Sequence, residues 1–84
     1  MSKREKLIKK MRENPKGIRF EEVDNLLISI GFDRRQPRKG SSHYIYRMGP
    51  YKLVIKRENP VKPVYIKEAI EIIDLIEKGE NRNE

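Results

Sequence analysis

The only histidine of this 84-residue chain, His43, lies between the segment KGSS and the run YIYR. An imidazole titrates near neutral pH, so it can accept or donate a proton in a reaction such as metal-free RNA cleavage. There it takes a proton from the ribose 2′-hydroxyl or gives one to the 5′-oxygen leaving group. The alternative is a structural histidine with a hydrogen bond of its own, and a lone histidine does not decide between the two.

Cations near His43 supply the second part of such a site, because a phosphate must be held beside the imidazole. The residues expected to contact RNA are Arg35, Arg38, Lys39, Ser42, Lys52, Lys56 and Arg57. Lys52 and Lys56 fall on one strand face and are also compatible with a simple solvated surface. The plainer use of the tyrosines Tyr44, Tyr46, Tyr51 and Tyr65 is packing of a sheet, and stacking on bases is the alternative.

Other catalytic arrangements have less support. A nucleophilic Ser41 or Ser42 has no third member of a triad, and a role in the turn is favoured. Glu21, Glu22 and Asp24 are interpreted as a solvated helix face. The chain has no cysteine, and one histidine without cysteine is a poor ligand set for zinc, so no metal and no other cofactor is expected.

The net charge of +7 is unevenly distributed along the chain. Residues 1–20 carry +6, residues 21–33 carry −4, residues 34–62 carry +8 and residues 63–84 carry −3. Such basic blocks are typical of a surface that binds a polyanion such as RNA or DNA, because each phosphate contact displaces a counterion. General solubility is the competing explanation for a basic balance.

The helices that position His43 are predicted from hydrophobic periodicity. A first helix over about 2–13, with Ser2 and Glu5 at the spacing of a capping box, ends at the segment NPKG. A second helix over about 20–30 has one apolar stripe, acidic residues in its first turns and Gly31 as its C-terminal cap.

The strands are predicted from alternation. A short strand is expected over 32–35, and the runs HYIYRM and YKLVIK around Gly49–Pro50 predict a β-hairpin. On its first strand His43, Ile45 and Arg47 face one way, and Tyr44, Tyr46 and Met48 face the other. Pro60 and Pro63 predict an irregular connection to a last helix over about 64–78. Residues 1–78 are expected to form one domain and residues 79–84 a disordered tail.

The predicted order, α-α-β-β-β-α, favours an α+β fold in which helices pack on one face of a three-stranded antiparallel sheet. Eighty-four residues suffice for one small domain. The apolar stretches are short and carry charges, and no signal-peptide pattern opens the chain. These features predict a soluble cytoplasmic protein without membrane contact.

The stretch RFEEVDNLLISIGFDRRQPRKGSSHYIYR resembles the HicA family, the small toxins of HicA–HicB toxin–antitoxin systems. The likeness extends from about residue 4 to residue 76 and is most specific at GSSHYIYR and at PVKPVYI. Many relatives read glycine-serine-histidine-histidine at this point. Alignment from IYR, which keeps the alternation of the strand, places the family's catalytic histidine at His43, whereas alignment from Gly40 places Ser42 there.

The resemblance implies a fold like a double-stranded-RNA-binding domain and a type II toxin that cleaves mRNA and arrests growth. It implies a metal-independent endoribonuclease with His43 as the catalytic residue, and a HicB-like antitoxin protein as the partner that covers the site. A non-catalytic RNA-binding module of the same fold is the main alternative. A DNA-binding helix-turn-helix in the first two helices is disfavoured by the acidic start of the second.

Overall fold

The computed structural model describes residues 3–36 and 42–81. Along the chain they form α1 (Lys3–Glu13), the short 3₁₀ helix η1 (Pro15–Gly17), α2 (Phe20–Ile30), β1 (Asp33–Arg35), β2 (His43–Met48), β3 (Tyr51–Lys56) and α3 (Pro63–Asn81). The described residues are thus arranged as an α+β fold, with three α-helices and a three-stranded antiparallel sheet. The element order expected from the sequence is confirmed.

The sheet has β2 in its centre, between β1 and β3. β2 and β3 are joined by the predicted turn at Gly49 and Pro50, where Gly49 has a φ of 57°, a left-handed value that glycine adopts readily. From this turn the register runs from Met48 opposite Tyr51 to His43 opposite Lys56. The histidine therefore lies at the end of the central strand that is far from the hairpin turn.

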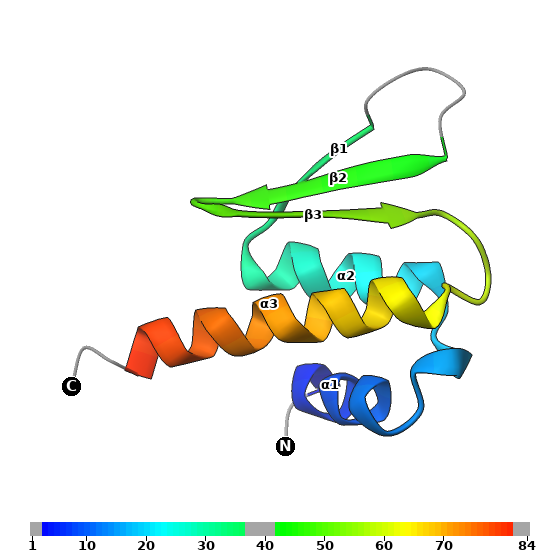
Figure 1. Ribbon diagram of the computed structural model, residues 1–84, viewed down its shortest axis with the longest axis horizontal. Coiled ribbons are helices and arrows are strands. Elements are labelled where there is room, and N and C mark those ends of the chain that lie inside the picture. Colours follow the sequence, from blue (N-terminus) through cyan, green and yellow to red (C-terminus); the bar gives the residue numbers. More distant parts are fainter. Residues whose placement is uncertain (1–2, 37–41, 82–84) are drawn as a thin grey trace.

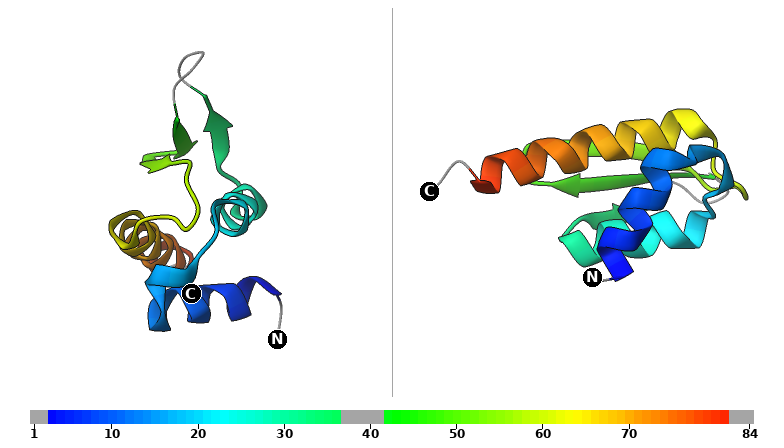
Figure 2. Two further views of the ribbon diagram at one scale, coloured as in Figure 1. Left: turned by 90° about the vertical axis from the view of Figure 1, so that its right-hand side faces the viewer. Right: turned by 90° about the horizontal axis from the view of Figure 1, so that it is seen from below.

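The described helices all lie on one side of the sheet (Figure 1). α2 and α3 lie next to the strands, and α1 lies beyond them, on the side away from the sheet (Figure 2). The core between these layers is made of Ile8, Met11, Ile18, Phe20, Val23, Leu26, Leu27, Phe32, Tyr46, Leu53, Ile55, Val61, Ile66, Ala69 and Ile73. The apolar stripes predicted for the helices therefore face one shared core.

Alternation along β2 and β3 decides which strand side chains enter this core. Tyr46, Leu53 and Ile55 point toward the helices and are at most 2% exposed. Arg47 and Lys52, each next in sequence to a buried residue, lie on the opposite face and are exposed. The predicted alternation is confirmed, and it leaves one face of the sheet without a described helix over it.

Hydrogen bonds at both ends of α2 fix its limits, and one of them joins it to the connection after β3. At the C-terminus Gly31 has a φ of 126°, and its N–H donates to two carbonyls of the last turn at 3.1 and 3.2 Å. At the N-terminus the Glu22 carboxylate accepts a hydrogen bond from the Arg19 backbone N–H at 3.0 Å. The Asn59 side-chain oxygen accepts another from the Phe20 N–H at 2.7 Å, which joins the connection after β3 to the start of α2.

The start of β1 differs from the predicted one, and the predicted start of α1 lies outside the described residues. β1 begins at Asp33 rather than at residue 32, because Phe32 turns into the core and is 3% exposed. α1 is described from Lys3 onward, so the capping residue predicted at Ser2 lies outside the described residues.

α3 starts earlier and ends later than predicted. Pro63 is its first residue, a position where a fixed φ and a missing N–H are tolerated. The helix continues to Asn81, so residues 79–81 of the predicted tail are helical, while residues 82–84 lie outside the described residues. No described helix is both long enough and apolar enough to span a bilayer.

Candidate nucleic-acid interface

The face of the sheet that points away from the helices carries most of the charged side chains of the strands, and we call it the open face. Its residues form three rows across the strands: His43 and Lys56; then Arg35, Ile45 and Val54; then Asp33, Arg47 and Lys52. Ile45 and Val54 are half-buried in the middle row. Cations around an apolar centre can hold a phosphate backbone while leaving apolar surface for the bases.

His43 lies at one end of the open face and is exposed. Its direct cross-strand neighbour is Lys56, and the Cβ atoms of such a pair lie about 4.5–5.5 Å apart. Beyond this pair the Arg57 backbone N–H donates to the Ser42 carbonyl at 2.6 Å, which keeps the two strands together past the imidazole. The histidine is therefore held on a fixed strand end, accessible to a large substrate and beside a lysine.

The open face contains three of the predicted RNA contacts, Arg35, Lys52 and Lys56, on the same side of the sheet as His43. It also contains Arg47, which was not among the candidates, although the alternation of β2 already placed it on the same side as His43. The sequence signal for Arg47 is the alternation of the strand, because every second residue after His43 lies on the same face.

The other predicted contacts lie elsewhere. Ser42 is exposed directly before β2. Arg57 follows Lys56 and therefore points to the opposite side, where its guanidinium carbon Cζ lies 5.7 Å from the centre of the Phe20 ring. Arg57 is thus not part of the open face. Arg38 and Lys39 lie outside the described residues.

Asp24 is not the solvated residue that the sequence suggested. It is only 9% exposed, and its two carboxylate oxygens accept hydrogen bonds from the Tyr46 hydroxyl at 2.7 Å and from Arg34 Nη1 at 2.8 Å. Burial, and next the hydrogen bond to Asp24, raises the pKa of Tyr46, so the phenol stays protonated and donates. The interpretation was wrong because both partners come from strands, 10 and 22 residues away in the chain.

A pocket of about 480 Å³ opens on the helix side of the sheet, behind β2 as seen from His43. We call it the aromatic pocket; its lining includes Phe20, Glu21, Asp24, Arg34, Tyr44 and Arg57. The rings of Phe20 and Tyr44 lie 5.3 Å apart, tilted by 50°. Arg34 Cζ lies 5.7 Å from the centre of the Tyr44 ring, and Arg57 Cζ lies 5.7 Å from the centre of the Phe20 ring. Each ring therefore has a guanidinium group over it.

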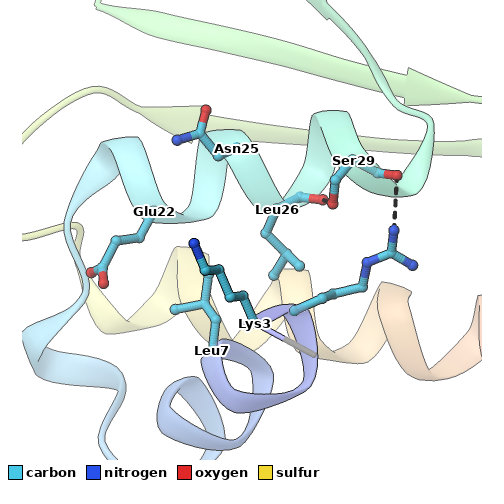
Figure 3. Close-up of a pocket in the computed structure, with 7 residues that line it drawn as sticks. Lys3, Leu7, Glu22, Asn25, Leu26 and Ser29 are labelled. Carbon is cyan, nitrogen blue, oxygen red and sulfur yellow. Dashed lines mark hydrogen bonds between the residues drawn. The ribbon is translucent and has the colours of Figure 1, made fainter. Parts of the chain in front are cut away.

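A second hollow, of about 550 Å³, lies between α1 and α2 (Figure 3). Leu7 and Leu26 contribute apolar lining, and Arg4 Nη2 donates to the Ser29 carbonyl at 3.1 Å. All of its lining residues belong to these two helices, so neither His43 nor the rest of the open face takes part in it.

Possible metal ligands do not gather at these places. Within residues 3–36 and 42–81, no three histidine, aspartate or glutamate side chains lie together in a way that could hold a metal ion. Asp24 is already bonded to Tyr46 and Arg34. The described part of the open face supplies one imidazole, several ammonium and guanidinium groups and the single carboxylate of Asp33.

Comparison with protein families, with curated proteins and with solved structures found no match to this chain. The likeness to the HicA family therefore depends on the residues quoted for it above. What the chain's own geometry offers is a site in two parts, the open face with His43 and the aromatic pocket on the other side of β2.

Proposed function

We propose that this protein is an endoribonuclease toxin of the HicA type, which cleaves mRNA without a metal ion on a fold like that of a double-stranded-RNA-binding domain. The observation that carries the proposal is the exposed His43 opposite Lys56, at one end of a basic sheet face. A surface that attracts phosphates brings the ribose-phosphate chain to the imidazole. A histidine on a neutral surface lacks this attraction.

In the proposed reaction a ribose 2′-oxygen attacks the adjacent phosphorus, and the bond from that phosphorus to the 5′-oxygen of the next nucleotide breaks. His43 takes the proton from the 2′-hydroxyl as a general base, or in its protonated form gives one to the departing 5′-oxygen. Lys56, across the strand, stabilises the negative charge that builds on the phosphate oxygens. The products are a 2′,3′-cyclic phosphate and a 5′-hydroxyl.

The rest of the open face binds the RNA on one side of the cleaved bond. Arg35, Arg47 and Lys52 contact phosphates, and their charge is reduced only in part by Asp33, which lies in the row of Arg47 and Lys52. These contacts are independent of sequence and position the chain along the sheet. The open face by itself therefore selects no base sequence within the proposed substrate, mRNA.

The proposed partner is a HicB-like antitoxin protein with an acidic surface, in the cytoplasm of the same cell. Half-buried Ile45 and Val54, with Arg47 and Lys52 next to them, are suited to such a partner, because interfaces combine an apolar centre with a charged rim. A partner on the open face would cover His43 and stop cleavage.

The test is incubation of the purified protein with labelled single-stranded RNA in EDTA. The wild type is expected to cut the RNA, and His43→Ala is expected to cut it at least about 100-fold more slowly, because general acid–base catalysis contributes about 10²–10⁴-fold. A DNA strand of the same sequence is expected to stay intact, because it has no 2′-hydroxyl to attack the phosphorus. Lys52→Ala, at the other end of the same face, is the matched control and should weaken binding while it keeps the cleavage step.

Two results would contradict the proposal. One is a His43→Ala protein, folded by its melting temperature, that cuts RNA as fast as the wild type. The other is a wild-type protein that binds RNA with a steep salt dependence and leaves it intact, which is the behaviour of a non-catalytic RNA-binding module.

The helix-turn-helix alternative gains nothing from the structure. A recognition helix presents its N-terminal residues to DNA. Here Phe20 is buried and its N–H is bonded to Asn59, and Glu21 and Glu22 follow in the first turn of α2. The first turn of α2 is therefore acidic, and its first residue is buried.

A further inference from the structure

We propose that the aromatic pocket binds a nucleobase of the RNA and prefers a base that carries an exocyclic amino group. The inference rests on the proposed RNA substrate and names the part of it that the helix side of the sheet recognises. Tyr44 in the lining of the pocket directly follows His43 along β2, so the pocket lies at the same end of the strand as His43 but on its opposite side.

Planar groups dominate the lining of the pocket. Bases stack on aromatic rings and on the guanidinium plane of arginine. Phe20 is 4% exposed and its ring lies against that of Tyr44, which is half-buried. Arg34 and Arg57 add a guanidinium group over each ring. The partners for stacking a flat heterocycle are thus Tyr44, which is half-buried, and the guanidinium planes of Arg34 and Arg57, which are exposed.

The charge of the pocket favours a neutral ligand. The guanidinium groups of Arg34 and Arg57 are offset by the carboxylates of Glu21 and Asp24, so the formal charges of the lining cancel. Arg34 is in addition engaged by Asp24 at 2.8 Å. The open face, by contrast, has an excess of cations. A phosphate is therefore drawn to the open face, and the uncharged base is the part of a nucleotide that suits the pocket.

Glu21 supplies the preference for an amino group. Its side chain is 55% exposed, and its ion-pair partner, Arg19 Nε, is as far as 3.9 Å away, so the carboxylate is loosely held. Carboxylates accept hydrogen bonds from base amino groups, as from N4 of cytosine. Uracil offers carbonyl oxygens in place of that amino group, and a carboxylate repels them.

The pocket has the size and the rigidity of a binding site. Its volume of about 480 Å³ falls within the range of about 300–1,000 Å³ that is usual for small-molecule sites. Asp24 in its wall is fixed by Arg34 and by the hydroxyl of fully buried Tyr46. A lining that is already ordered costs less entropy when a ligand binds.

The experiment is a titration of the full ¹⁵N-labelled chain with cytidine and with uridine, followed by amide shifts in correlation spectra. Nucleosides carry no phosphate, so the open face has nothing to attract, and no cleavage is involved. Cytidine is expected to cause saturable shifts at Phe20, Glu21 and Tyr44. Uridine is expected to bind about tenfold more weakly, which is the usual scale of discrimination by a base-edge contact.

Two variants and a control identify the groups responsible. Tyr44→Leu keeps apolar volume but removes the ring, and should weaken both nucleosides about tenfold. Glu21→Met changes an exposed side chain, removes its hydrogen-bond acceptor and should bring cytidine down to the affinity of uridine; it keeps the test valid if Tyr44→Leu does not fold. Lys9→Ala on α1, a helix that contributes no residue to the lining of the pocket, should leave both affinities unchanged.

The inference is overturned if cytidine causes no saturable shift, if the shifts centre on open-face residues such as Arg47, or if uridine binds as tightly as cytidine. Its failure is distinct from failure of the proposed function. Saturable cytidine binding by a protein that never cuts RNA keeps the pocket and rejects the nuclease. RNA cleavage by a protein that binds no nucleoside keeps the nuclease and rejects the pocket.

Discussion

His43 and Tyr46 are three residues apart on β2, yet they belong to opposite environments. His43 is exposed on the open face, whereas Tyr46 is fully buried and bonded to Asp24. Because successive strand residues point to opposite faces, β2 presents reactive side chains on one face and packs against the core with the other. Substitutions at the two positions should accordingly affect different properties, the rate of cleavage at one and the stability of the fold at the other.

At the residue scale, Tyr46→Phe is expected to lower the free energy of unfolding by about 1.5–3 kcal/mol, the scale of a hydrogen bond to a charged group. The ring still fills the core, but one oxygen of the buried Asp24 loses its donor. Urea denaturation at neutral pH measures the change. Tyr51→Phe, a half-buried tyrosine on β3, is the control, with an expected loss below about 0.5 kcal/mol. Equal losses in the two variants would reject this role for the hydroxyl.

At the scale of elements, the features that could be predicted from the sequence are those whose determinants are local. Gly49 with Pro50 marks the hairpin turn, Gly31 marks the end of α2, and alternation assigns the faces of β2 and β3. The aromatic pocket could not be predicted, because α2, β1, β2 and the connection after β3 each contribute to its lining. Asp24 was misjudged for the same reason, since a helix pattern does not show what a distant strand places against it.

The contact between α1 and α3 includes an ion pair of Arg12 with Asp74, in which Arg12 Nη1 lies 3.1 Å from Asp74 Oδ2. The hydrogen bond from Arg12 lowers the pKa of Asp74 below its ordinary value. The folded protein therefore holds this carboxylate ionised at a pH where the same aspartate in the unfolded chain, whose pKa is near 3.9, binds a proton. The stabilisation by this ion pair is complete at a pH above the pKa of Asp74 in the unfolded chain. It is lost as the pH falls through the lower pKa of Asp74 in the folded protein.

Asp74→Asn is therefore expected to lower the free energy of unfolding at pH 7, by less than about 1 kcal/mol, because the two side chains are 43% and 40% exposed and solvent screens the pair. The difference from the wild type should shrink as the pH falls below about 4. Urea denaturation at pH 7 and at about pH 3 measures it, with Glu68→Gln on the same helix as the control. A difference that grows toward acid pH would contradict the assignment.

At the scale of the whole molecule, basic side chains occupy two opposite surfaces. The open face lies on one side of the helices α2 and α3, and α1, rich in lysine and arginine, lies on the other (Figure 2). α3 is mainly acidic over residues 63–81. The net charge of +7 is therefore compatible with RNA on either surface, and only RNA on the open face reaches His43.

Salt dependence separates the two surfaces. In single-strand binding, each phosphate contact contributes about −0.7 to the slope of log K against log salt concentration, because a contact releases a condensed counterion. Lys52→Ala on the open face is expected to reduce the slope by about that amount for any RNA sequence, whereas Lys9→Ala on α1 leaves it unchanged. Fluorescence anisotropy with labelled RNA measures both slopes, in a His43→Ala background so that the RNA stays whole. If Lys9→Ala changed the slope and Lys52→Ala did not, the RNA would lie on α1, too far from His43 for the imidazole to act on it.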